Sequence, residues 1–191
     1  MKTIIFDTSS NYLYLSFLLD DKLIYEYFVE GKNKHAENLI VQIEKALKLL
    51  DYKISDMDRI CIGNGPGSYT GLRVSTTIGK VFAWLLDIPL YIASSLEILS
   101  SGYYLKDGVY AVSMKAKKDY VYARIIKIEN KKKTIIKEDM FIEDEVFNKM
   151  IKDYQCLLIN ETNYKIEPNF INYKKALNIH NLEPNYLRRG V

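Results

Sequence analysis

Apolar residues fall into two patterns along the chain, short continuous runs and longer runs with helical spacing. Three strand-like runs come first, KTIIFDTS, YLYLSFLLD and KLIYEYFVE, and Asp20-Asp21 marks a turn between the last two. Residues 35–50 then place apolar side chains at helical spacing: Leu39, Ile40, Ile43, Ala46, Leu47 and Leu50. The pattern predicts a three-strand meander followed by a helix.

The next fifty residues alternate between strand-like and helix-like runs. RICIGNG predicts a short strand that is apolar on both faces, as a central parallel strand is. A helix is expected over 71–86, ending before Pro89, then a strand in PLYIAS and a short helix in SSLEILSSGYY. The order is strand, strand, strand, helix, strand, helix, strand, helix. This is the order of the ribonuclease H-like, actin-like ATPase half-domain.

The remainder repeats this order in a shorter form. GVYAVSM, YVYARIIKIE and TIIKEDMFI predict another three-strand meander, EDEVFNKMIKDY a helix and CLLIN a strand. We therefore expect an α/β protein with the actin-like ATPase (ribonuclease H-like) fold. It should have two lobes with mixed sheets: a complete lobe over 1–101 and a reduced lobe over 102–191.

The stretch GNGPGSYTGLR, residues 63–73, is rich in glycine but matches no phosphate-binding motif. A P-loop fails because Gly79-Lys80 is followed by Val81, and a dinucleotide fingerprint fails because residue 68 is serine. What remains is backbone geometry. The glycines permit crowded or left-handed backbone, and a hydroxyl can cap the next helix; the residues concerned are Gly65, Gly67, Gly71, Ser68 and Thr70.

Two interpretations of this loop stay open. Backbone N–H groups at the start of a helix form a generic anion site. Asp7 and Thr8, at the end of the first strand, stand where actin-like ATPases place a phosphate hairpin. The favoured alternative is a tight strand-to-helix turn that packs the helix hard on the sheet.

The helix after the loop carries small residues along one stripe, Ser75, Gly79 and Ala83, at a spacing of four. The remaining positions are largely apolar, which predicts burial on more than one side. A small stripe lets another helix approach closely, so we expect Ser75 and Gly79 to face a partner protein. The alternative is a core helix covered on both sides.

Composition and the missing motifs exclude several classes of function. The net charge of +3 is too small to imply nucleic-acid binding, and the lysine runs 115–118 and 131–133 are expected to be solvated hairpin tips. With two histidines and no H-x-x-x-H spacing, no metal site is expected. After Gly108 the only glycine is Gly190, which argues against an adenosine-binding loop.

Location is indicated by what the chain lacks. No charged-then-apolar leader opens it, no apolar run reaches the length of a membrane span, and both cysteines lie in strand-like runs. We expect a cytoplasmic protein without membrane contact, and Cys61 and Cys156 as small core residues.

Four segments resemble the TsaB (YeaZ) family of tRNA threonylcarbamoyladenosine biosynthesis proteins: IIFDTSSNYLYLSFL, KHAENLI, GNGPGSYTGLRV and the tail EPNYLR, Glu183 to Arg188. The resemblance covers the first hundred residues and returns at the tail. The chain departs from the family in MKAKKDYVY, where Lys115 and Lys117 replace an aspartate and an arginine.

The resemblance implies a non-catalytic subunit that pairs with TsaD, the enzyme that makes threonylcarbamoyladenosine at position 37 of tRNAs reading codons that begin with A. It also implies the ATPase TsaE as a partner and tRNA contact only through the complex. No cofactor is required, while a nucleotide at the partner interface and a homodimer of the free protein stay open. The implied partner face is formed by helices 35–50 and 71–86, with candidate residues His35, Leu39, Gly71, Arg73, Ser75, Gly79 and Ala83.

Two enzyme classes are the alternatives. A free-standing actin-like ATPase or small-molecule kinase is disfavoured by the missing glycines of the second half. A metallopeptidase is disfavoured by the histidine count.

Overall fold

The structure, a computed structural model, describes residues 1–30 and 35–187; for residues 35–37 the description covers the backbone only. The described residues form two compact units. The first contains 1–93 and 172–185, and the second contains 94–171 and begins again at Tyr186. The expected boundary at 101/102 thus lies eight residues later than the observed one, and the return of segment 172–185 to the first unit was not predicted.

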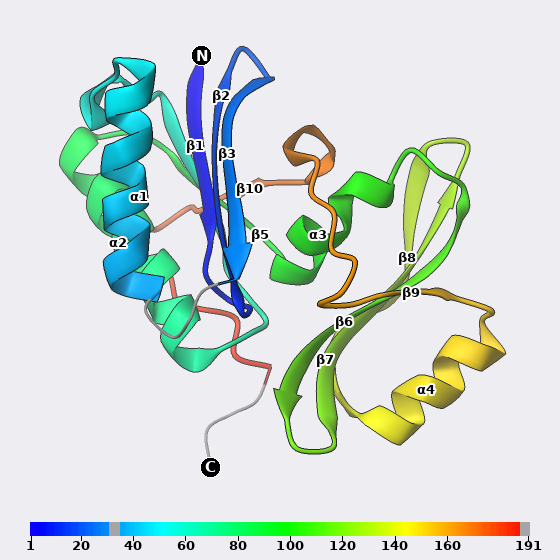
Figure 1. Ribbon diagram of the computed structural model, residues 1–191. Coiled ribbons are helices and arrows are strands. Elements are labelled where there is room, and N and C mark those ends of the chain that lie inside the picture. Colours follow the sequence, from blue (N-terminus) through cyan, green and yellow to red (C-terminus); the bar gives the residue numbers. More distant parts are fainter. Residues whose placement is uncertain (31–34, 188–191) are drawn as a thin grey trace. The chain divides into compact units, whose positions relative to one another are not determined.

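The first unit is built on a six-stranded sheet in the order β10-β5-β4-β1-β2-β3 (Figure 1). β1, β2 and β3 form the antiparallel meander, while β4 and β5 continue the sheet parallel to β1. The strands are β1 Lys2–Asp7, β2 Tyr12–Leu19, β3 Lys22–Glu30, β4 Arg59–Gly63, β5 Leu90–Ala93 and β10 Lys174–Lys175. The parallel strands are joined by helices, as such connections require.

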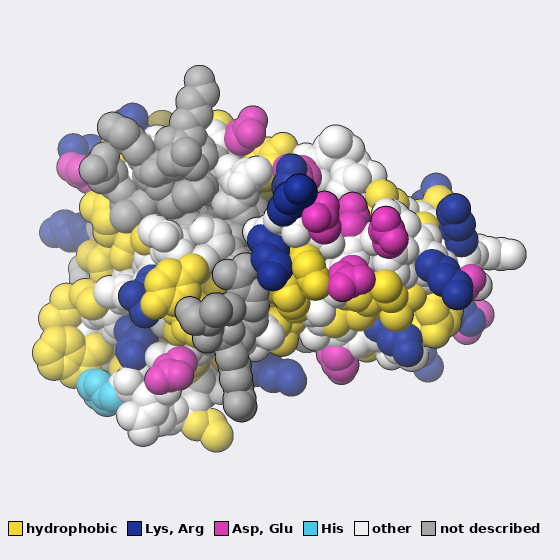
Figure 2. Space-filling model, turned by 90° about the horizontal axis from the view of Figure 1, so that it is seen from below, with side chains coloured by type: hydrophobic (Ala, Val, Ile, Leu, Met, Phe, Trp, Pro, Cys, Tyr) yellow, Lys and Arg dark blue, Asp and Glu magenta, His cyan; other side chains and the backbone are white. Residues whose placement is uncertain are grey.

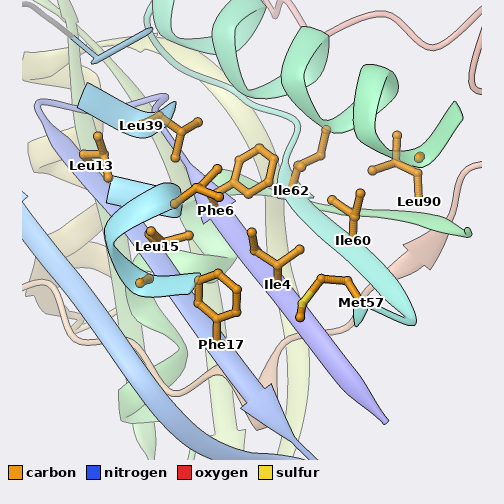
Figure 3. Packing of buried hydrophobic residues seen from close by; sticks show 13 residues of the cluster. Ile4, Phe6, Leu13, Leu15, Phe17, Leu39, Met57, Ile60, Ile62 and Leu90 are labelled. Atoms are coloured by element: carbon orange, nitrogen blue, oxygen red, sulfur yellow. The ribbon is translucent and has the colours of Figure 1, made fainter. Parts of the chain in front are cut away.

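Two helices cover one face of this sheet, α1 (His35–Leu50) and α2 (Tyr69–Leu86), with a 3-10 turn at Ile54–Asp56 before β4. Figure 3 shows the core beneath them, where Leu39 of α1 lies over apolar side chains of β1, β2 and β4. Leu39, Ile43 and Ala46 of α1 are buried. Each fully buried leucine or isoleucine contributes about 1.5–3 kcal/mol, so this face anchors α1 on the sheet.

The second unit has a four-stranded sheet in the order β8-β7-β6-β9. Its three long strands are an antiparallel meander, and the short strand β9 pairs parallel to β6. Its helix α4 packs on one sheet face around the buried Phe147. The elements are α3 Ser95–Ser100, β6 Gly108–Lys117, β7 Tyr120–Glu129, β8 Lys132–Glu143, α4 Asp144–Asp153 and β9 Leu157–Ile159, with 3-10 turns at Ser101–Tyr103 and Pro168–Phe170.

The two sheets share a strand order. In the first unit the strands in chain order 3-2-1-4 are β3-β2-β1-β4, and in the second they are β8-β7-β6-β9. The first sheet continues to β5 and β10, whereas the second ends at β9. The expectation of a complete lobe followed by a reduced copy is therefore met at the level of strand order. Within the described part, no helix is long and apolar enough to span a membrane.

Candidate functional site: the glycine loop and helix α2

The glycine loop connects β4 to α2 and lies against the turn that follows β1. Ser68 is the N-cap of α2, and its hydroxyl accepts a hydrogen bond from the Gly71 amide at 3.4 Å. The Ser68 amide donates to the carbonyl oxygen of Ser9 at 2.7 Å, and the Thr8 hydroxyl donates to the carbonyl oxygen of Gly71 at 2.7 Å. The loop and the turn 7–10 are therefore bonded directly to each other.

The glycines allow this close approach. A Cβ at Gly71 would overlap the carbonyl oxygen of Thr8, and a Cβ at Gly67 would overlap that of Ser9. Both neighbours are backbone atoms, which cannot rotate away as the end of a side chain can. Glycine is thus required here by packing between two backbone segments.

Several amides of the loop and of the start of α2 have protein acceptors. Those of Asn64 and Leu72 donate to the carbonyl oxygens of Ala93 and Ser68, at 2.9 and 2.8 Å. The carboxylate of Asp7 is buried and accepts from the Ser9 amide at 2.7 Å. These hydrogen bonds are of the kind that the tight-turn interpretation predicts. Thr70 is exposed on the first turn of α2.

The small stripe of α2 faces the sheet, so the expectation that Ser75 and Gly79 face a partner is wrong. Ser75 is fully buried and its hydroxyl donates to the carbonyl oxygen of Gly63 at 3.2 Å. A Cβ at Gly79 would lie 2.9 Å from Cγ2 of Ile62. Ala83 is also buried. The small residues let α2 pack closely on the sheet. The apolar pattern of α2 covers nearly the whole helix, so it could not show whether the small residues contact the sheet or another helix.

Two further candidates, Leu39 and Gly71, are also buried and face inward. Arg73 is exposed, with its guanidinium carbon 4.0 Å from the centre of the Tyr69 ring. The backbone of His35 begins α1 as expected, while its side chain lies outside the described residues. Of the predicted interface residues with described side chains, only Arg73 is on the outer surface.

The outer surface of α2 carries large apolar side chains that are not among the predicted interface residues. Tyr69, Val81, Trp84 and Leu85 are exposed by 56%, 43%, 62% and 65%. With Arg73 and Thr77 they form a row at spacings of three and four, here called the outer row of α2. Ile40 and Val41 are exposed on the neighbouring helix α1. Figure 2 shows hydrophobic side chains gathered at the left of the face it draws, over the helices of the first unit.

The described residues contain no group of histidine, cysteine, aspartate and glutamate side chains that could hold a metal ion. Burial raises the pKa of the Cys61 thiol to about 12, which keeps it protonated and non-nucleophilic at neutral pH. The main feature of the site is the exposed group of Val81, Trp84 and Leu85 at the end of α2, since residues three and four apart are neighbours on a helix surface. Grouped exposed apolar side chains can mark a binding surface, whereas scattered single ones are ordinary.

Comparison with known proteins identifies the family of the chain. Residues 30–178 match the family model described as TsaD, tRNA N6-adenosine threonylcarbamoyltransferase. The tRNA threonylcarbamoyladenosine biosynthesis protein TsaB of Bacillus subtilis is 33% identical over 130 residues, which are 68% of this chain and 57% of the relative. The chain therefore spans little more than half the length of that relative.

Two solved structures from Pseudomonas aeruginosa have the same fold. One is described as a protein with similarity to the peptidase YeaZ and the other as YeaZ, with TM-scores of 0.68 and 0.65. Each is 22% identical, and the matches cover 75% and 74% of this chain and 67% of each neighbour. The chain belongs to the threonylcarbamoyltransferase (TsaD) domain family, and within it to the TsaB, or YeaZ, group.

Proposed function

We propose that this protein is the non-catalytic scaffold subunit of the complex that makes threonylcarbamoyladenosine in tRNA, and that it binds the catalytic subunit TsaD through helices α1 and α2. The observation that carries this proposal is the outer row of α2, which exposes Tyr69, Val81, Trp84 and Leu85 on a helix fixed rigidly to the sheet. The name of the Bacillus subtilis relative supports the pathway. The proposal also includes the ATPase TsaE as a further partner, a homodimer of the free chain and a nucleotide bound at the interface.

The composition of the outer row suits a binding face. Tryptophan, tyrosine and arginine dominate the binding energy of protein interfaces, and here Trp84, Tyr69 and Arg73 lie on one side of one helix. A standard interface buries about 1,600 Å² in total, which two neighbouring helices and their rims can supply. The contribution of such a subunit is to hold its partner in the active arrangement.

An independent actin-like ATPase or kinase is the alternative that the loop geometry disfavours. In that class the turn after the first strand receives the phosphate groups. Here Thr8 and Ser9 of that turn are bonded to the glycine loop, and Asp7 is buried. A nucleotide would have to displace these contacts.

The test is co-purification with the TsaD protein of the same cell. Trp84→Glu places a charge in the apolar part of the proposed interface and should weaken binding by about 2 kcal/mol or more. Because Trp84 is mostly exposed in the free protein, the variant should fold normally. Lys149→Glu, at an exposed position of α4, is the matched control and should bind as the wild type does. Unchanged binding by Trp84→Glu would exclude the α2 outer row as the interface.

A second measurement tests the pathway itself. Depletion of this protein should lower threonylcarbamoyladenosine in total tRNA, as measured by nucleoside mass spectrometry, and the Trp84→Glu variant should fail to restore it. A normal level in depleted cells would refute the proposed role.

A further inference from the structure

The C-terminal segment 172–185, here called the strap, returns from the end of the chain to the first unit. Its two-residue strand β10 pairs antiparallel with β5, and the Ala176 amide donates to the carbonyl oxygen of Leu90 at 2.9 Å. Further along, Ile179 and Leu182 pack on the hydrophobic core of the unit. The strap is therefore an integral part of this unit and not a loose end.

The strap is also bonded to helix α2. The ammonium group of Lys80 donates to two strap carbonyl oxygens, that of His180 at 2.9 Å and that of Leu182 at 3.1 Å. Lys80 adjoins Val81 in the sequence and precedes Trp84 by one helical turn. One side chain of α2 thus fixes the strap beside the apolar end of the outer row.

A second set of bonds joins the strap to the glycine loop. The side-chain amide of Asn64 donates to the carbonyl oxygen of Glu183 at 3.2 Å, and the Asn185 amide donates to the carbonyl oxygen of Asn64 at 2.8 Å. Gly65 has a φ of +102°, and a Cβ there would lie 2.8 Å from the carbonyl oxygen of Asn185. Only glycine accepts both that backbone angle and that contact without strain.

These bonds connect the two most recognisable segments of the sequence. The loop GNGPGSYTGLR and the tail signature that begins at Glu183 are more than a hundred residues apart, yet one main-chain hydrogen bond and one from the Asn64 side chain join them. Arg188, the last residue of that signature, lies outside the described residues. The loop leads directly into α2, so contacts that hold the loop in place also hold the first turn of the helix in place.

We propose that the strap is a positioning element for the partner face: through Lys80 and Asn64 it holds the glycine loop and α2 in the conformation that binds the partner. This inference rests on the proposed function. If the face adopts its binding conformation in only a tenth of the molecules once the strap is released, the apparent dissociation constant of the complex with the partner rises tenfold. The residues concerned need not touch the partner.

The experiment measures the affinity of full-length variants for the TsaD protein of the same cell, by calorimetry. Lys80→Met removes both donors while keeping the aliphatic stem, and we expect about a tenfold weaker complex because charge-assisted bonds to the strap are lost. Lys80→Arg keeps donors and should bind within about twofold of the wild type. Asn64→Asp, which loses its donor at the other anchor, should weaken binding as Lys80→Met does.

Hydrogen exchange separates positioning from general stability. In Lys80→Met and Asn64→Asp the amides of residues 64–72 and of the strap should exchange faster, while those of β2 and α4 stay as in the wild type. Lys149→Met on α4 is the control and should change neither affinity nor exchange. Uniformly faster exchange in all elements would assign the strap a purely structural role and overturn the proposal.

The Trp84→Glu variant distinguishes the two levels of inference. Loss of binding by Trp84→Glu together with wild-type binding by Lys80→Met and Asn64→Asp would overturn the strap proposal and leave the proposed function standing. Wild-type binding by Trp84→Glu would overturn the proposed face, whatever the strap variants do.

Discussion

At the scale of single residues, the glycines of the loop allow backbone atoms of the turn 7–10 to approach closely, because glycine has no side chain. Gly71 faces the carbonyl oxygen of Thr8, and the same pair is joined in the other direction by the Thr8 hydroxyl, which donates to the Gly71 carbonyl oxygen. Any side chain at residue 71 would push apart the turn and the helix that this bond holds together.

We therefore expect Gly71→Ala to lower the free energy of unfolding by about 1–3 kcal/mol, the usual effect of overpacking, since the neighbour is rigid backbone. Urea denaturation measures this. Thr77→Ala, at an exposed position of the same helix, is the control and should stay within about 0.5 kcal/mol of the wild type. If the two variants are equally stable, the backbone contact does not determine the choice of glycine.

Charged side chains of the second unit form a buried cluster that the sequence did not reveal. Arg124 is buried and pairs with Glu97 at 3.2 Å and with Asp139 at 2.7 Å. Lys133, expected at a solvated hairpin tip, instead pairs with Glu97 and lies 4.8 Å from the centre of the Tyr104 ring. Removing one member of a buried pair strands the other charge, which makes this cluster sensitive to substitution.

Asp139 should give the protein a pH-dependent stability. Burial raises the pKa of this carboxyl above its ordinary value of 3.8, against the opposing attraction of Arg124. The native state then holds this proton to higher pH than the unfolded state does. The stability that Asp139 contributes is present below pH 3.8 and is lost as pH rises through the raised pKa.

The measurement is urea denaturation of the wild type and of Asp139→Asn over a series of pH values from below 3.8 upward. The difference in unfolding free energy, wild type minus variant, should fall as pH rises. Asp153→Asn, at an exposed position of α4, is measured in the same series as the control. A difference that grows with pH would mean that Arg124 dominates and that the pKa of Asp139 is lowered.

At the scale of elements, helix α2 has two apolar sides with different roles. The side with Ser75, Gly79 and Ala83 packs on the sheet, and the side with Trp84 and Leu85 is exposed. Small residues occupy the inner side because the helix lies close to Ile62 and Leu90. Large residues occupy the outer side, where a partner would bury them.

Gly79→Arg should therefore unfold or strongly destabilise the protein, by more than about 3 kcal/mol, because it places an unpaired charge against Ile62. Thermal unfolding followed by circular dichroism measures this. Thr77→Arg, two residues earlier on the outer row, should leave the melting temperature nearly unchanged. A well-folded Gly79→Arg variant would show that α2 can be lifted from the sheet without loss of the fold.

At the scale of the whole molecule, two units with the same strand order differ in completeness. The first has the longer sheet, helices α1 and α2 and the strap, while the second stops after its fourth strand. The turn 7–10, which in an ATPase would receive phosphate, is hydrogen-bonded to the glycine loop and to the start of α2.

We expect the purified protein to hydrolyse no ATP above the level of contaminating enzymes. Phosphate release assays on the wild type and on Asp7→Ala measure this, and both should give the same background rate. Turnover that disappears in Asp7→Ala would favour the kinase-like alternative over the scaffold.

The sequence alone determined the element order and the fold class, because the spacing of apolar residues within a short segment distinguishes a strand from a helix. The span of α1 over 35–50, the meander of the first three strands and the shorter second copy were all predicted from that periodicity. The glycine motif and the tail were sufficient for the resemblance to the TsaB family, because that judgement depends only on the order of residues.

Only the tertiary structure decided which side of α2 faces outward. Because apolar residues surround most of α2, their spacing does not indicate which side of the helix is buried. The side with the small residues packs on the sheet because only a residue without a side chain fits at position 79 against Ile62. The return of the strap was equally hidden, since two residues in β10 have no pattern of their own. Both features depend on contacts between segments far apart in the chain, and such contacts are settled by steric fit in the folded protein and not by local propensity.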